Sequence, residues 1–258
     1  MAPTLDARAG STGQRLRSLR EARLTVLATW QHRRVPQVSR EDERYERWLG
    51  WLEGVDRDVT QLALDRFVFQ RLGEITHAAE LPASYLFDAL NYWYVRSQAT
   101  AVRRQCEVHR DAASLASLLD QIRAYPNVLT RSRYVGLCVV GQDDQREHAR
   151  YRQRGHEAFD GLAGQGNQTI PAERIEPDLQ RLADVAEPVK RFVDRLVAHW
   201  DRRGLSELPT FADLNAAIDV IGEVYRDWSQ WLTAQFRAEL VPAFQYDWEA
   251  PLRVAWLR

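Results

Sequence analysis

The stretch VKRFVDRLVAHWDRR, Val189–Arg203, shows the residue period that decides the fold class. At 100° per residue, its apolar side chains fall within one arc and form the stripe of a core-facing helix. These side chains are Val189, Phe192, Val193, Leu196, Val197 and Trp200. His199 lies just beside the stripe, with Arg195 one turn before it on the same flank. His199 is therefore either a working residue or a boundary histidine bonded to a neighbouring helix, and its spacing leaves both open.

The helical period recurs along most of the chain, and no segment shows the strict alternation of a strand. The expected helices cover residues 14–35, 40–80, 84–110, 112–125, 146–159, 177–203 and 210–240. Ser39 and Asp111 are expected N-caps, and Thr210 with Asp213 comes close to a capping box. The second helix could break near Gly54, and Pro188 should kink or split the sixth. The sequence therefore predicts an all-α bundle of long antiparallel helices.

The domain organisation is simple. Residues 1–13 are polar and predict a disordered tail, and residues 14–258 predict a single all-α domain. Within it, residues 141–169 have a weak pattern and are expected to form a loop-rich insertion with one short helix. Helix 84–110 is apolar around much of its first half, which predicts a central place in the bundle. The aromatic tail from Phe244 should pack back onto the helices.

Tryptophans at helical spacings are expected to pack in the core rather than to stack on nucleic-acid bases. They are Trp48, Trp51, Trp93, Trp228 and Trp231.

Composition narrows the function classes. The formal net charge of −1 over 258 residues gives no overall basic excess for nucleic acid or a membrane. Lys190 is the only lysine among 35 basic residues, so counts of arginine carry little weight. Cys106 and Cys138 are too few for a disulfide framework or a cysteine-based zinc site. No apolar run approaches the roughly 18 to 20 residues of a membrane span. A cytoplasmic protein without membrane contact is expected.

Other common chemistries find little support in the sequence. No glycine-rich phosphate loop or nucleophile elbow is present. The HEAFD stretch at His156 offers at most a pair of metal ligands. Cys106 lies beside two arginines, but a lone helical cysteine is usually buried. We expect neither a metal nor a cofactor.

Several blocks resemble a known family. RLVAHWD followed by TFADLNAAID, YVRSQATAVRRQ followed by SLASLLDQI, and the terminal QYDWEAPLRVAWL are similar to the AbiU-type abortive-infection branch of the HEPN superfamily. These blocks span most of the chain from about residue 85 to the end. The resemblance implies a HEPN-like helical bundle, a homodimer and a role in antiviral defence as a toxin. It also implies RNA as a ligand, and a cognate antitoxin or nucleotidyltransferase as a partner.

In active superfamily members, an arginine and a histidine spaced R-x4-6-H cleave RNA without a metal. Imidazole can move the 2′-hydroxyl proton, and guanidinium can hold the phosphate through two hydrogen bonds. Here the three positions that could carry the arginine before His199 hold Asp194, Val193 and Phe192. Arg195 is one residue too close. The motif is therefore incomplete at its best match.

A second arginine source lies on the central helix. Arg103 and Arg104 have the literal motif spacing to His109, but about two such matches are expected by chance in so arginine-rich a chain. His109 could equally be a cation at a helix end. Arg103 and Arg104 could instead face His199 across the bundle or dimer. The alternative is that they pair with carboxylates such as Asp194 and Asp201.

Two hypotheses result. In the first, the protein is a metal-independent ribonuclease, with His199 as general acid or base and an arginine holding phosphate. The arginine candidates are Arg195, Arg103 and Arg104, supported by Asp194, Asp201 and Lys190, with His109 a weaker candidate. In the second, the chain is a degenerate member that only binds RNA, a nucleotide or a protein. The incomplete motif favours the second, and the family's association with phage defence favours the first.

Overall fold

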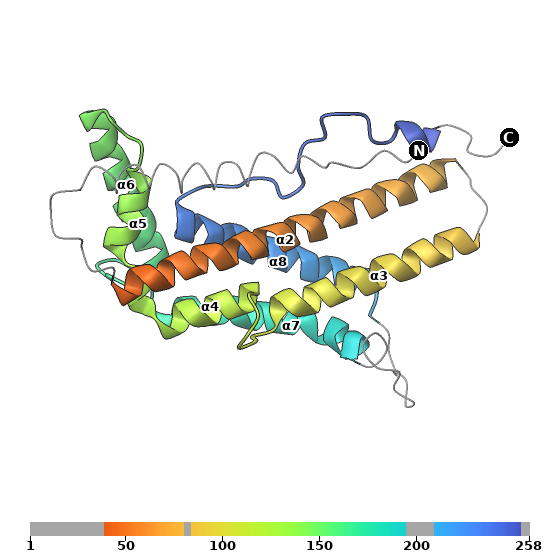
Figure 1. The fold of residues 1–258 in the computed structure, drawn as a ribbon, viewed down its shortest axis with the longest axis horizontal. Helices are drawn as coiled ribbons and strands as arrows, with labels where there is room; N and C mark the ends of the chain where they lie inside the picture. Colours follow the sequence, from red (N-terminus) through yellow and green to blue (C-terminus); the bar gives the residue numbers. More distant parts are fainter. Residues whose placement is uncertain (1–38, 80–83, 195–208, 254–258) are drawn as a thin grey trace. The chain divides into compact units, whose positions relative to one another are not determined.

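Helices supply the regular structure in residues 39–79, 84–194 and 209–253, the ranges that the computed structural model describes (Figure 1). The all-α prediction is confirmed. The described residues from Glu41 on form one compact unit. In these ranges, no helix is both long and apolar enough to span a bilayer. The elements are α2 (Arg40–Ala78), α3 (Tyr85–Cys106), α4 (Leu115–Ala124), η1 (Pro126–Val128), α5 (Arg131–Cys138), α6 (Gln145–Ala163), η2 (Ala172–Arg174), α7 (Glu176–Phe192), α8 (Phe211–Thr233) and η4 (Ala250–Arg253).

Several predicted features lie outside the described residues. They are the disordered tail 1–13, the helix over 14–35 and the last part of the helix predicted to reach residue 203.

Helices α2 and α3 run antiparallel, side by side (Figure 1). The acidic first turn of α2 suits the positive end of the helix dipole. Gly54 does not break α2, which continues as one helix through it. The two helices are joined by Gln105, whose Nε2 donates to Asp58 Oδ2 over 2.8 Å, and by Gln98, which donates to Asp65 over 3.3 Å.

The core takes its residues mainly from α2, α3, α4, α7 and α8, and α7 packs against α3, α4 and α8. The apolar face predicted for α4 is confirmed, because its four large residues are at most 1% exposed. These residues are Leu115, Leu118, Leu119 and Ile122. Val189 on α7 and Val193 directly after this helix are buried on the predicted stripe, and the helix passes through Pro188 without a split in its described part. Trp48 and Trp228 are fully buried, as predicted.

Helix α4 begins later than the sequence predicts. Its N-cap is Ser114 rather than Asp111, and Ser114 Oγ accepts from the backbone N–H of Ser117 over 3.0 Å. Ser114 is buried and Asp111 exposed. A buried N–H needs a protein partner, which a solvent-exposed Asp111 three residues earlier does not supply. At α8, by contrast, Thr210 and Asp213 form the predicted capping box.

The segment predicted as a loop-rich insertion is mostly helical. Asp144 accepts from two backbone N–H groups and starts α6, a helix of 19 residues. Phe159 of α6 is fully buried, and the guanidinium of Arg131 lies over its ring at 5.0 Å. Arg131 also binds Asp160 and the carbonyl oxygens of two residues, Asn167 and His156. The buried ring of Phe159 and the buried Arg131 thus hold α6 against the bundle. The weak apolar periodicity of this polar helix did not predict its full length.

Helix α8 ends at Thr233, earlier than predicted, and Ala234 takes a left-handed conformation with φ of 54°. The following strap, residues 235–249, runs beside α2. Phe244 and Trp248 pack on Phe67 with ring centroids 5.8 and 6.2 Å apart. Glu249 Oε1 lies 2.7 Å from Arg71 Nε. The predicted return of the tail onto the bundle is confirmed for these residues.

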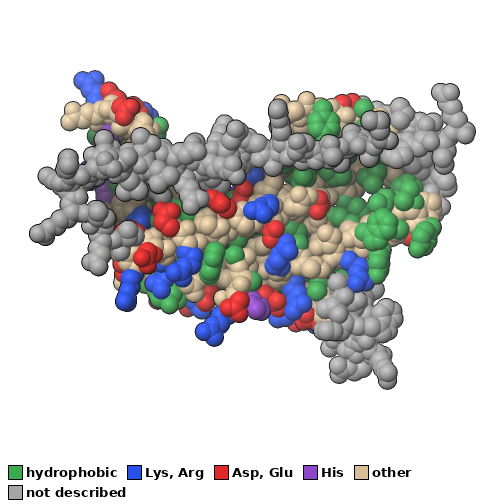
Figure 2. Space-filling model, viewed as in Figure 1, with side chains coloured by type: hydrophobic (Ala, Val, Ile, Leu, Met, Phe, Trp, Pro, Cys, Tyr) green, Lys and Arg blue, Asp and Glu red, His purple; other side chains and the backbone are tan. Residues whose placement is uncertain are grey.

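The first half of α3 is not central, and this prediction was wrong. The buried residues of α3 all lie from Gln98 onward. Tyr85 is 87% exposed, and Leu86, Tyr92 and Trp93 are each more than half exposed. Figure 2 shows hydrophobic side chains gathered on the surface where α2 ends and α3 begins. Core packing was therefore also the wrong expectation for Trp93.

Candidate functional site

The candidate site is a charged cluster where the end of α3 meets the end of α7. It consists of Arg103, Glu107, Lys190 and Asp194, and Arg104 lies at its edge. Arg103 Nη2 lies 2.9 Å from Asp194 Oδ1, and its Nε lies 3.2 Å from Glu107 Oε2. Lys190 Nζ lies 3.0 Å from the other oxygen of Glu107. The cluster thus links the two helices by alternating charges.

The helices place these side chains by simple spacing. Arg103 and Glu107 are four residues apart at the end of α3, and Lys190 and Asp194 have the same spacing at the end of α7. Residues four apart lie on one helix face, so each helix presents a cation and a carboxylate to the other. Val102 of α3 and Val189 of α7 are fully buried, and the two helices pack against each other.

Arg104 points to a different partner. Its Nη2 lies 2.8 Å from Oδ2 of Asp58 on α2, the same oxygen that accepts from Gln105. Gln105 is fully buried, and its Oε1 accepts from the backbone N–H of Leu115 over 3.0 Å. Asp58 and Gln105 therefore hold the start of α4, the end of α3 and α2 in one polar network.

The charges act on one another. Burial opposes ionisation of Glu107, but the hydrogen bond from Lys190 and the charge of Arg103 outweigh it and lower the pKa of this carboxyl. The hydrogen bond to Glu107 raises the pKa of Lys190 in turn. Both groups are therefore charged over the neutral range, and the carboxylates offset the positive charge of the cluster.

The structure unites some of the predicted site residues. Arg103, Lys190 and Asp194 meet in the charged cluster, and Arg104 lies at its edge against Asp58. Of the alternatives that the sequence leaves open for Arg103, the ion pair with Asp194 is present. His199, Arg195 and Asp201 lie outside the described residues.

His109, the weaker candidate, lies beyond the end of α3 and is exposed. Its backbone N–H donates to Ser117 Oγ over 2.9 Å, and its carbonyl oxygen accepts from the same hydroxyl over 3.1 Å. The last turn of α3 is closed by Glu107, whose N–H donates to the carbonyl of Arg103. The backbone of His109 therefore anchors the loop before α4.

Cysteine and metal chemistry gain no geometric support. Burial raises the pKa of the Cys106 thiol to about 12, so it is a buried core residue rather than a reactive thiolate. Asp160, near His156, is engaged by Arg131. Across residues 39–79, 84–194 and 209–253, no three His, Cys, Asp or Glu side chains group closely enough to hold a metal ion.

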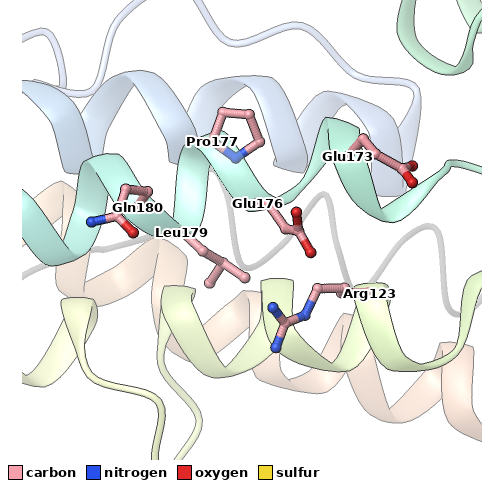
Figure 3. Close-up of a pocket in the computed structure, with 6 residues that line it drawn as sticks. All are labelled: Arg123, Glu173, Glu176, Pro177, Leu179 and Gln180. Atoms are coloured by element: carbon pink, nitrogen blue, oxygen red, sulfur yellow. The ribbon is translucent and has the colours of Figure 1, made fainter.

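A separate open pocket of about 520 Å³ lies between α4 and the start of α7 (Figure 3). Arg123 of α4 and Glu176 of α7 lie on facing walls, and Arg123 pairs with Asp120 over 2.6 Å. The remaining lining residues are Glu173, Pro177, Leu179 and Gln180. Its lining mixes charges and holds no nucleophile beside a base, so it lacks the elements of a catalytic site.

Sequence reasoning missed Glu107, Asp58 and Gln105. The i,i+4 spacing of Arg103 and Glu107 was a usable signal for the first. Asp58 and Gln105 belong to different helices, and their pairing depends on the register of α2 against α3, which one sequence does not reveal.

An anion that binds Arg103 has to compete with Asp194, because the two side chains are already paired. A phosphate reaching Arg103 must displace Asp194, and a half-exposed ion pair of this kind contributes only about 0 to 1 kcal/mol.

Comparisons of this chain with models of known protein families, with curated proteins and with solved structures find no match.

Proposed function

We propose that this chain is a HEPN-like protein of the phage-defence or toxin type that cleaves RNA without a metal. One observation carries the proposal. The 2.9 Å contact between Arg103 and Asp194 places a guanidinium of α3 at the end of α7, five residues before His199 in the chain. An arginine from a second helix can thereby replace the one that the local motif lacks. The resemblance to AbiU-type proteins supports the same reading.

In this proposal, His199 takes the 2′-hydroxyl proton or protonates the leaving oxygen, because imidazole titrates near neutral pH. Arg103 holds the phosphate through its guanidinium after Asp194 gives way. Arg104 and Arg195 contribute further positive charge, while Lys190 keeps Glu107 ionised and away from the phosphate.

A second candidate function is supported by the ion pairs themselves. Both Arg103 and Arg104 have carboxylate partners, at 2.9 and 2.8 Å, so their charge is already balanced. Such an arrangement suits a degenerate relative that binds RNA, a nucleotide or a protein without cleaving. Under either function, the resemblance makes a second copy of this chain, a cognate antitoxin or a nucleotidyltransferase the partners to test.

The deciding experiment is cleavage of labelled transfer RNA and total RNA by the purified protein in excess EDTA. Wild type is compared with His199→Ala and with the Arg103→Ala/Arg104→Ala double variant. Loss of a general acid or base should lower the rate by about 10²- to 10⁴-fold. His148→Ala and Arg152→Ala on α6 are matched controls that should keep full activity.

Circular dichroism checks that each variant is folded. RNA that stays whole with folded wild type, or cleavage that persists in His199→Ala, would contradict the nuclease. Intact RNA that is nevertheless bound, with weaker binding by the double arginine variant, would support the degenerate binding module.

A further inference from the structure

One face of α3 carries exposed rings at one end and arginines at the other. Tyr85, Tyr92 and Trp93 are 87%, 56% and 60% exposed. At 100° per residue, these rings lie within a roughly 120° arc that also contains Arg96, Arg103 and Arg104. We call these six residues the ring–arginine face. At 1.5 Å per residue it extends for about 28 Å along the helix.

The rings on this face are exposed although the opposite side of the helix is packed against the bundle. The opposite side of the same turn packs normally, because Tyr94 stacks on Phe69 with centroids 3.8 Å apart. Tyr92 is also held in place, since Arg96 Nη1 donates to its hydroxyl and the guanidinium lies 5.0 Å from its ring centre. An exposed ring fixed by an arginine is ready to receive a flat partner, because little side-chain freedom remains to be lost.

We propose that the ring–arginine face binds single-stranded RNA, with bases stacked on the rings and phosphates held by the arginines. This inference rests on the proposed function and gives the path by which a strand reaches Arg103. Proteins that bind single strands combine aromatic platforms with positive charge along the backbone. Within α3, Asp88 is the one acidic residue against three arginines. Glu107 and Asp194 pair with Arg103, and Asp58 pairs with Arg104, so a phosphate that binds either arginine has to displace a carboxylate.

The composition of the face favours a nucleic acid over a partner helix. Helix-in-groove binding uses apolar anchors at i, i+3, i+4 and i+7, whereas on this face arginines follow the rings and Leu86 is the one large aliphatic residue that α3 exposes. Val95 and Val102 point to the core side. Thr100 is exposed on the same arc and donates its own hydrogen to the carbonyl of Arg96, so its oxygen can accept from a 2′-hydroxyl.

The test is fluorescence anisotropy of the full chain with a labelled, unstructured RNA of about 12 nucleotides, within the roughly 4 to 16 that single-strand sites cover. Tyr92→Ala and Trp93→Ala should each weaken binding by about tenfold, and Trp93→Phe should restore most of it, because a ring suffices for stacking. Arg96→Gln should weaken binding and reduce its salt dependence.

The matched controls are rings exposed elsewhere. Phe236 and Tyr246 are 77% and 70% exposed on the segment after α8, so Phe236→Ala and Tyr246→Ala should bind RNA as wild type does. Equal affinity of the α3 ring variants and these controls would overturn the proposal. Equal affinity of a DNA strand with the same base order would overturn the choice of RNA.

Analytical sedimentation tests the alternative that this face is a protein–protein interface. If Trp93→Ala loses self-association while its RNA affinity is unchanged, the face is a protein interface and the proposal fails. Failure of RNA binding by the ring–arginine face and failure of RNA cleavage can be told apart. Cleavage that survives in the ring variants with unchanged RNA affinity refutes the face alone, and ring-dependent binding without cleavage refutes the nuclease alone.

Discussion

The two halves of α3 differ in apolar content and in burial, and the more apolar half is the less buried one. The first half, residues 85–97, contains all five aromatic residues of α3 and has no buried residue. The second half, residues 98–106, buries five, and two of these are glutamines. Apolar content therefore did not determine which half entered the core.

The difference follows from the partners of each half. Gln105 is buried because Asp58 and the N–H of Leu115 satisfy its amide. Val102 is buried beside it. Trp93 has no such surroundings and stays 60% exposed. A buried polar group with partners on two other elements marks a structural region, whereas an exposed ring marks a surface available for binding.

The largest expected effect comes from placing the same charge in each half. Val102→Asp buries an unpaired carboxylate in a site that is 0% exposed and should destabilise the fold by about 4 kcal/mol or more. Trp93→Asp should change the free energy of unfolding by only about 0.5 kcal/mol. Urea denaturation measures both. Similar losses of unfolding free energy in the two variants would mean that both halves of α3 are equally buried.

The second test concerns the buried amide. Gln105→Ala leaves the N–H of Leu115 and the carboxylate of Asp58 without this partner, which should lower the free energy of unfolding by about 1 to 3 kcal/mol. Gln153 is its matched control, because it is exposed on α6 and makes a single hydrogen bond of 2.8 Å to Glu157. A Gln105→Ala variant as stable as Gln153→Ala would show that the network contributes little.

The sequence predicts the elements of this molecule better than their surroundings. Repeating apolar spacings found α4, and a capping pair found the start of α8, because both are local signals. The burial of α3 is not local. Its first half reads as core by composition, yet its exposure depends on what α7 and α8 cover. The apolar pattern of one segment does not predict which part of it the other helices cover.

The same difference between local signals and contacts of distant segments explains which parts of the candidate site the sequence predicts. Pairing of Arg103 with a carboxylate such as Asp194 was among the sequence alternatives, because charges at helix ends are visible in the sequence. The contact of Arg104 with Asp58 was not, since it needs the register between α2 and α3. Most of the site contacts that the sequence did not predict join helices that are distant in the sequence.

A smaller effect is expected where the second half of α3 reaches the surface. Asp194→Asn removes the negative charge that competes with phosphate for Arg103, so RNA affinity should rise several-fold, while the free energy of unfolding changes by less than about 1 kcal/mol. Asp120→Asn is the control, because it breaks a comparable pair with Arg123 on α4. Equal RNA affinity in both variants would exclude Arg103 as a phosphate ligand.

The smallest effect is a dependence on pH at Glu107. Its pKa is lowered from 4.5 on folding, so the unfolded chain binds the proton more readily, and the ion pair stabilises the fold above pH 4.5. This contribution disappears as pH falls through the lowered pKa. Because the pair is partly exposed, its size should stay below about 1 kcal/mol.

Urea midpoints from pH 3 to 6 test this expectation. Glu107→Gln should be less stable than wild type near pH 6 and should converge with it at the acid end, because protonated Glu107 and glutamine are both neutral. Lys190→Gln should shrink the same step, since Lys190 supplies the hydrogen bond that favours the carboxylate. A separation between wild type and Glu107→Gln that stays constant over this range would mean that the link between α3 and α7 depends on shape and hydrogen bonding rather than on charge.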